Sequence, residues 1–252
     1  MEVFFRIHRV MHKDPYIHLS DLKEEVRKLS DPKRAETNAW FFKTGKGEYG
    51  EGDKFAGLSV PKCRQIAKNF KDLELADIKE LLNSPIHEER LIAIFILVSK
   101  FSKADEKIRT GIFTFYLKNT KQINNWDLVD SSAYFIVGEF LLDKPRSILY
   151  ELAKSKNIWE RRIAIIASLQ FIKKRKEYKD TFEIAELLLK DDHDLIHKAA
   201  GWMLREVGEK VGEKELIEFL SKHYKEMPRT MLRYAIEKFQ QNLRKRYLNG
   251  LV

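Results

Sequence analysis

Hydrophobic residues recur at intervals of three and four along most of this chain, which is the spacing that places them on one face of an α-helix. No segment shows the sustained alternation of period two that a half-buried strand requires. Proline marks several expected helix starts, at Asp31-Pro32, Ser59-Val60-Pro61 and Lys144-Pro145, where its missing N–H costs nothing. The pattern predicts about a dozen helices and no sheet. The clearest stripes are Leu91, Ile94, Phe95 and Val98, then Ile163, Ile166, Ala167 and Phe171, and finally Leu216, Phe219 and Leu220.

The predicted helices also repeat at a nearly constant spacing. The segment Ile86-His87-Glu88-Glu89-Arg90-Leu91 resembles Ile158-Trp159-Glu160-Arg161-Arg162-Ile163, and related segments begin at Ile123 and Ile196. The leading isoleucines are about 35 to 38 residues apart, a period typical of HEAT-like arrays of helix pairs. Each such repeat buries its apolar face only against its neighbours, so the repeats stack into a solenoid.

The expected architecture follows from this repeat. We expect residues 19–252 to form a single all-α domain, a curved HEAT-like solenoid, with residues 1–18 as an N-terminal extension. One helix of each pair lines the concave face of a solenoid, and the four aligned segments are the candidates for that face. Glycine and proline, at 11 and 6 residues, are too scarce for the many turns of a β-sandwich or barrel.

One segment departs from the helical pattern. Five glycines fall in the stretch KTGKGEYGEGDKFAG, between Gly45 and Gly57. The stretch lacks the spacing of a phosphate-binding P-loop and the Lys-Ser/Thr that follows it. Two interpretations stay open, a flexible connection between helices or a mobile loop near a ligand.

The charge balance favours a polyanionic partner. The chain carries 47 Lys and Arg against 38 Asp and Glu, a net charge of +9. For a folded basic protein we expect nucleic acid first and an anionic membrane surface second.

The cysteine count and the hydropathy of the chain limit the cellular compartments in which we expect the protein. Cys63 is the only cysteine, which excludes a disulfide framework and a thiolate zinc site. No apolar run approaches the roughly 18 residues of a membrane span, and the first residues lack the apolar core of a signal peptide. We therefore expect a cytoplasmic protein.

Tryptophan is unevenly distributed. Three of the four tryptophans fall in the aligned segments, each with a charged residue three or four positions later on the same helix face. The simpler interpretation is core packing together with a ladder of ion pairs between repeats. However, a core helix does not need a carboxylate beside its tryptophan, because a buried unpaired charge is costly. The pairs are Trp126 with Asp130, Trp159 with Arg162, and Trp202 with Arg205.

A carboxylate beside aromatic faces suits one chemistry in particular. Cleavage of an N-glycosidic bond places positive charge on the sugar. A nearby carboxylate stabilises that charge and can orient the attacking water. Indole faces also attract cations, and arginines on neighbouring helices can hold the flanking phosphates.

Three segments in this order, NNWDLVD, NIWERRIAI and AAGWMLREVGE, resemble the AlkD family of DNA alkylation repair glycosylases. The resemblance runs from about Leu22 to Phe239 and is strongest from Asn124 to Gly208. It implies a HEAT-like solenoid whose basic concave cleft binds DNA. It also implies excision of positively charged N3- and N7-alkylated purines from duplex DNA, without a metal or other cofactor. The expected partner is duplex DNA containing alkylated bases, bound by a monomer.

The resemblance also implies roles for individual residues. Trp126 and Trp202 correspond to the indoles packed against the deoxyribose of the lesion, which family members contact in place of a flipped base. Asp130 corresponds to the carboxylate that stabilises the sugar cation and positions water. Arg162 corresponds to a phosphate contact near the lesion, and Arg205 to a further DNA contact.

The chain departs from the family pattern near its N-terminal end. Phe41, in NAWFFK, stands where the family has a tyrosine, and Ser59 stands where the best-known members have a longer polar residue. The glycine-rich stretch is also unlike those members. We keep Phe41 and Ser59 as expected DNA contacts and expect this wall of the cleft to hold DNA in its own way.

Two alternatives remain from the residues alone. One is a HEAT-like module that binds damaged or branched DNA without cleaving it, and the other is a protein-binding solenoid. His193 and His197 have a spacing that can bind a metal, but a helix start with acidic caps and solvent-exposed histidines explains them better.

Overall fold

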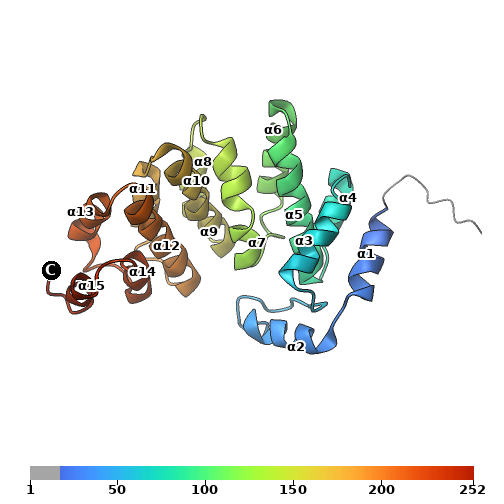
Figure 1. Cartoon of the computed structure of the whole chain (residues 1–252), viewed down its shortest axis with the longest axis horizontal. Coiled ribbons are helices and arrows are strands. Elements are labelled where there is room, and N and C mark those ends of the chain that lie inside the picture. Colours follow the sequence, from blue (N-terminus) through green and yellow to red (C-terminus); the bar gives the residue numbers. More distant parts are fainter. Residues whose placement is uncertain (1–17) are drawn as a thin grey trace, which may run out of the picture.

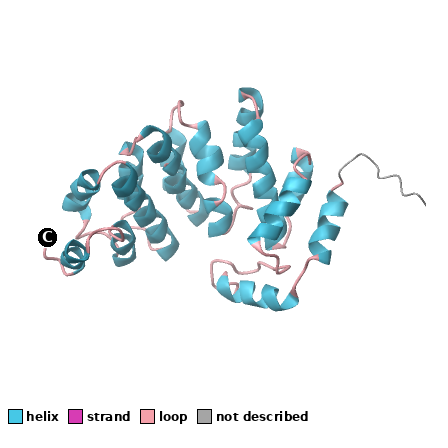
Figure 2. Cartoon of the chain, viewed as in Figure 1, coloured by secondary structure: helices cyan, strands magenta, loops and turns pink. Residues whose placement is uncertain are grey.

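Helices make up most of the computed structural model, which describes residues 18–252 (Figure 1). Figure 2 shows helices joined by loops and no strand, which confirms the all-α prediction for this part of the chain. Residues 1–17 of the expected N-terminal extension lie outside the described residues. The helices are α1 (Leu19–Lys28), α2 (Pro32–Phe41), α3 (Val60–Asn69), α4 (Leu75–Leu82), α5 (His87–Lys103), α6 (Glu106–Lys118), α7 (Trp126–Asp130), the π-helix η1 (Tyr134–Gly138), α8 (Ser147–Ala153), α9 (Ile158–Ala167), α10 (Leu169–Arg175), α11 (Lys179–Leu187), α12 (Asp194–Lys210), α13 (Glu213–His223), α14 (Arg229–Ala235) and α15 (Gln241–Leu248).

From α4 onward the helices stack in two layers along an arc (Figure 1). One layer consists of α5, α7, α9, α12 and α14, each in contact with the next. The second layer packs behind it, with α4 and α6 against α5, α8 against α9, and α11 and α13 against α12. The four aligned sequence segments supply α5, α7, α9 and α12, so the sequence repeat corresponds to a structural repeat.

Close backbone contact holds neighbouring repeats together. Gly201 lies where α12 crosses α14, and a Cβ atom at this position would stand 2.5 Å from the carbonyl oxygen of Met231. Gly138 of η1 approaches the carbonyl of Ala167 in the same way. The apolar stripes of the sequence are buried, except for Val98, which is half-buried, as expected for helices that pack on both sides.

Ion pairs also join successive repeats. The guanidinium of Arg161 donates to both oxygens of Asp191, at 2.5 and 3.2 Å. Arg146, just before α8, binds Asp180 of α11 at 2.7 Å. Ion pairs thus do join successive repeats here, although the sequence analysis expected them for the charged residues that follow Trp126, Trp159 and Trp202. Within the described residues, no helix combines the length and the apolar character needed to cross a membrane.

Candidate active site

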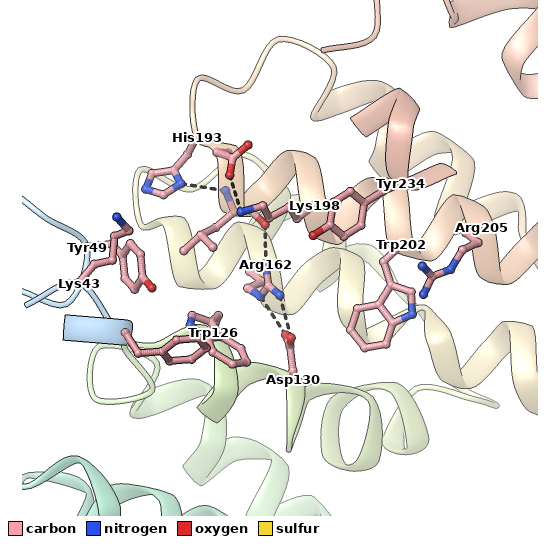
Figure 3. A pocket seen from close by; sticks show the side chains of 13 residues that line it. Lys43, Tyr49, Trp126, Asp130, Arg162, His193, Lys198, Trp202, Arg205 and Tyr234 are labelled. Carbon is pink, nitrogen blue, oxygen red and sulfur yellow. Dashed lines mark hydrogen bonds and ion pairs between the residues drawn. The ribbon is translucent and has the colours of Figure 1, made fainter. Parts of the chain in front are cut away.

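A cleft of about 640 Å³ opens on the inner layer of helices (Figure 3). It brings together six of the seven residues predicted as site residues, although they come from four different helices. The seventh, Ser59, is the N-cap of α3 and is not part of the lining. The lining residues are Phe41, Lys43, Tyr49, Trp126, Asp130, Arg162, His193, Asp194, Leu195, Lys198, Trp202, Arg205 and Tyr234.

Asp130 and Arg162 form the floor of this cleft. Arg162 Nε and Nη2 donate to the two oxygens of Asp130, at 2.8 and 2.7 Å, and Nη1 donates to the carbonyl of Leu195 at 2.5 Å. The Arg162 side chain is 6% exposed and that of Asp130 is 19% exposed. Burial raises the pKa of Asp130 above its ordinary value, while the charge and hydrogen bonds of Arg162 oppose the rise. The carboxylate is thus poorly solvated but fixed in orientation.

Two indoles flank this carboxylate. In Figure 3, Trp126 lies to one side of Asp130 and Trp202 to the other. Trp126 stacks on Phe42, with ring centroids 5.3 Å apart and planes 17° apart, and it meets Phe41 edge-on at 6.0 Å. The Trp202 indole donates to Glu206 at 2.9 Å. Both indoles are therefore held by neighbours on their own side of the cleft.

Trp159, the third repeat tryptophan, does not line the cleft. It is 6% exposed and belongs to the core, so the core interpretation is correct for this residue. Arg162 turns toward Asp130 of the previous repeat, so these two residues do not form a paired face.

The short helix α7 is fixed at both ends, which sets the positions of Trp126 and Asp130. At its start, the buried side chain of Asn125 accepts a hydrogen bond from the Trp126 N–H at 2.8 Å. At its end, the hydroxyl of Ser132 donates to the Leu128 carbonyl at 2.6 Å, and the π-helix η1 follows. A side chain that bonds within the helical ladder commonly interrupts it, and π-turns are frequent at functional sites.

A buried ionic cluster, which the sequence analysis did not identify, contacts α7 through Asp127. His87 lies between two carboxylates, with Nε2 2.8 Å from Asp127 and Nδ1 3.3 Å from Asp53. Burial opposes protonation of His87, but the charge and hydrogen bonds of Asp127 and Asp53 outweigh it and raise its pKa to about 9. Arg90 adds an ion pair with Asp53 at 2.7 Å. Nothing in the local pattern marks these residues, since they are distant in sequence.

The glycine-rich stretch forms a loop that reaches the cleft. Lys43 and Tyr49 are cleft-lining residues that the sequence reasoning did not select. The far end of the loop is held by the buried carboxylate of Glu88, which accepts hydrogen bonds from the N–H groups of Ala56 and Gly57 at 2.8 and 2.9 Å.

The other lysine and arginine side chains of the cleft are also paired with acidic residues. Lys198 binds Asp194 at 2.7 Å, and Arg205 binds Glu237. Glu237 and Asp194 are themselves substantially exposed, and exposed ion pairs are worth little. A phosphate group can therefore compete for these cations.

Comparison with known proteins assigns the chain to a family. Residues 22–239 match the profile of the DNA alkylation repair enzyme family. The chain belongs to this family. Membership indicates an enzyme of DNA alkylation repair with DNA as its substrate.

A solved structure shares the fold of this DNA alkylation repair family member. It is described as a "predicted DNA alkylation repair enzyme" from Enterococcus faecalis, and it is 16% identical with a TM-score of 0.66. The similarity covers 84% of this chain and 97% of that one. At this identity the likeness concerns the all-α repeat fold alone. No curated protein sequence matches the chain significantly.

The histidine pair at the start of α12 has a structural explanation. His193 is the N-cap, and its Nδ1 accepts a hydrogen bond from the Leu195 N–H at 3.1 Å. His197 bonds to the carbonyl of Asp191, and both rings are half-buried, so the expectation of solvent-exposed histidines was wrong. Among residues 18–252, no three His, Cys, Asp or Glu side chains are grouped to hold a metal ion.

Phe41 and Ser59 lie in different settings. Phe41 is 54% exposed at the end of α2, beside Trp126 in the cleft wall. Ser59 is the N-cap residue of α3, and its side chain makes no capping hydrogen bond. DNA contact by either residue, and phosphate contact by Arg162 and Arg205, remain predictions.

Proposed function

We propose that this protein is a DNA glycosylase that excises positively charged N3- and N7-alkylated purines from duplex DNA. The observation that carries the proposal is the fixed carboxylate of Asp130, flanked by Trp126 and Trp202 in a cleft on the inner face. Family membership provides the setting of alkylation repair.

The chemistry assigned to Asp130 is electrostatic. When the bond between the sugar C1′ and the base nitrogen breaks, its electron pair neutralises the cationic base, and the positive charge passes to the deoxyribose. A poorly solvated carboxylate interacts more strongly with that charge than a carboxylate in water. Water then adds to C1′ and releases a proton, and Asp130 can orient this water through lone pairs that Arg162 leaves free.

The two indoles also favour the positively charged state of the sugar. The face of an aromatic ring attracts a cation by roughly 0.5 to 2 kcal/mol, depending on how far the cation is desolvated. Trp126 and Trp202 would pack against the deoxyribose, exclude water from it and favour its charged state. Arg162 holds the carboxylate, and it is also the expected contact to a phosphate near the lesion.

The leaving group removes the need for a strong general acid. An alkylated purine that carries a positive charge departs as a neutral base. His193 is the only histidine that lines the cleft in the described residues, and burial lowers its pKa while its ring nitrogen caps α12. The mechanism therefore asks for no acid, metal or nucleotide cofactor from the protein.

Two cations of the cleft lining would hold the DNA backbone. Lys198 and Arg205 line the cleft, and their closest acidic partners, Asp194 and Glu237, are exposed enough for a phosphate to replace them. Binding through such contacts weakens steeply as salt is added, because each phosphate contact releases condensed counterions.

The test is release of N7-methylguanine from a methylated duplex by the purified chain, measured in the presence of a chelator. Time-dependent release that leaves an abasic site supports the proposal. Binding to the same duplex without release would contradict it.

One observation favours a second candidate, a non-catalytic module that binds damaged or branched DNA. Both oxygens of Asp130 are engaged by Arg162, as in the structural ion pair between Asp191 and Arg161. If the first pair also serves only to join repeats, the duplex binds and no base is released.

A further inference from the structure

A second hollow, of about 610 Å³, adjoins the cleft on the side of the C-terminal helices. Three residues line both the cleft and this hollow, namely Asp194, Lys198 and Tyr234. The residues that line the hollow but not the cleft are Thr230, Arg233, Glu237 and Arg244. We call it the Arg233–Arg244 hollow.

The two arginines of this hollow have no partner within the protein. Arg34, Arg233 and Arg244 are the only arginines among the described residues whose side chains make no hydrogen bond, ion pair or ring contact. Two of these three therefore lie in one hollow beside the cleft. The Nε atom of Arg244 is buried, and a buried N–H group without an acceptor is costly in a folded protein. The hollow thus offers hydrogen-bond donors that the protein itself does not satisfy.

The carboxylates of the hollow are paired with other cations. Asp194 binds Lys198 at 2.7 Å, and Glu237 binds Arg205 of the cleft. Neither carboxylate forms an ion pair with the two arginines of the hollow. The positive charge of these arginines is therefore not neutralised by a neighbouring acid, and the hollow is suited to an anion.

The place of the hollow in the fold indicates which anion this is. Its lining comes from α12, α14 and α15, and α14 follows α12 along the inner layer of the arc (Figure 1). A duplex bound at the cleft extends past it, so its backbone would meet the next helix of the inner layer. A guanidinium keeps its charge and can bind two phosphate oxygens with parallel hydrogen bonds.

We propose that the Arg233–Arg244 hollow is a phosphate-binding subsite that holds the DNA backbone beyond the cleft. The inference rests on DNA as the substrate of the family. It goes beyond the proposed glycosylase function, because it requires a phosphate group and no damaged base. Undamaged duplex should therefore occupy the subsite as well.

The experiment measures the affinity for an undamaged duplex over a range of salt concentrations, by fluorescence anisotropy. One double variant, Arg233→Gln with Arg244→Gln, removes both charges, and a second, Arg233→Lys with Arg244→Lys, keeps them. The control is Lys245→Gln, which removes an exposed charge next to Arg244 on α15 that does not line the hollow. Thermal unfolding of each variant checks that it is folded, and the absence of side-chain partners predicts no large loss of stability.

Each phosphate contact adds about 0.9 to the slope of log affinity against log salt for duplex DNA. We expect the glutamine double variant to lower this slope by about 0.9 or more. Its affinity at low salt should fall by about tenfold or more, because charge-assisted hydrogen bonds are lost. The lysine double variant and Lys245→Gln should keep the slope of the parent.

An unchanged slope in the glutamine double variant overturns the inference, and so does an equal decrease in Lys245→Gln. Release of N7-methylguanine from a methylated duplex is measured with the same proteins. If no protein releases base but the slope falls as expected, the glycosylase proposal fails and the phosphate subsite stands. Release by the parent with an unchanged slope in the glutamine double variant gives the opposite result.

Discussion

The guanidinium of Arg162 donates to both carboxylate oxygens of Asp130, at 2.8 and 2.7 Å, across two successive repeats. This ion pair therefore has a role both in the packing of the repeats and in the proposed chemistry. The same contact that joins α9 to α7 fixes the plane of the carboxylate and helps to keep it charged.

Removing Arg162 should therefore affect both stability and activity. Arg162→Met keeps a long side chain but leaves Asp130 buried without its partner, which typically costs about 3–5 kcal/mol of unfolding free energy. Base release should fall by about 100-fold, because a misplaced catalytic group loses most of its effect. Urea denaturation and single-turnover release measure the two effects. Wild-type release from a destabilised variant would show that the ion pair is only structural.

The pH dependence of base release should report Asp130. Burial raises its pKa above the ordinary value of 3.8, so protonation occurs at a higher pH than for an exposed aspartate. The rate should be constant at neutral pH and fall as the pH decreases through this raised pKa, because only the carboxylate stabilises a cation. Rate profiles with a folded-state control by circular dichroism give the position of this limb. A profile without an acid limb above 3.8 contradicts the assignment.

His87 predicts a second, separate pH effect, on stability. Its pKa is raised from 6.5 in the unfolded chain to about 9 in the folded protein by Asp127 and Asp53. The stabilisation is fully present below the unfolded pKa and is lost as the pH rises through about 9. The shift corresponds to a loss on the order of 3 kcal/mol across that interval.

The measurement is the free energy of unfolding as a function of pH, for the parent and for His87→Gln. Glutamine can keep hydrogen bonds to the carboxylates but cannot titrate. We expect the slope between neutral and alkaline pH to be smaller in the variant. Equal slopes in both proteins would mean that His87 is not the titrating group.

Two glycines give a matched test of the repeat packing. Gly201→Ala places a Cβ atom 2.5 Å from the Met231 carbonyl oxygen and should destabilise the protein by roughly 1–3 kcal/mol. Gly111→Ala, within α6, meets no atom within 4 Å and should stabilise it by about 0.5–1 kcal/mol through helix propensity. Thermal unfolding of both variants distinguishes the effect of the steric contact at Gly201 from the effect of helix propensity at Gly111. A tolerated alanine at Gly201 would contradict the close crossing of α12 and α14.

The sequence predicts the inner layer well because helical periodicity is local. The spacing of Trp126 and Asp130 places both on one face, and both line the cleft. The partner of Asp130 follows from the repeat in principle, since Arg162 is one repeat further along and ladders of ion pairs join such positions. The ladder interpretation of the sequence covers Asp130 and Arg162 and is confirmed for this pair, whereas the family resemblance assigns Arg162 to a phosphate.

Other parts of the site could not be predicted from local sequence patterns. Tyr49 lies in a loop without periodicity, and its contacts to α7, α9 and α12 exist only once the solenoid curves. The cluster of Asp53, His87 and Asp127 joins three distant segments. No spacing rule identifies such groups, because burial and proximity are set by tertiary packing.

The most direct test of the account compares Asp130→Asn with Asp191→Asn. Asp191 forms an equivalent two-oxygen pair with Arg161 outside the cleft lining, so its variant controls for the loss of an inter-repeat ion pair. The measurement is single-turnover release of N7-methylguanine from a methylated duplex, together with duplex affinity. We expect Asp130→Asn to abolish release while still binding the duplex, and Asp191→Asn to release base at close to the parent rate. Release by Asp130→Asn at the parent rate would contradict the central claim.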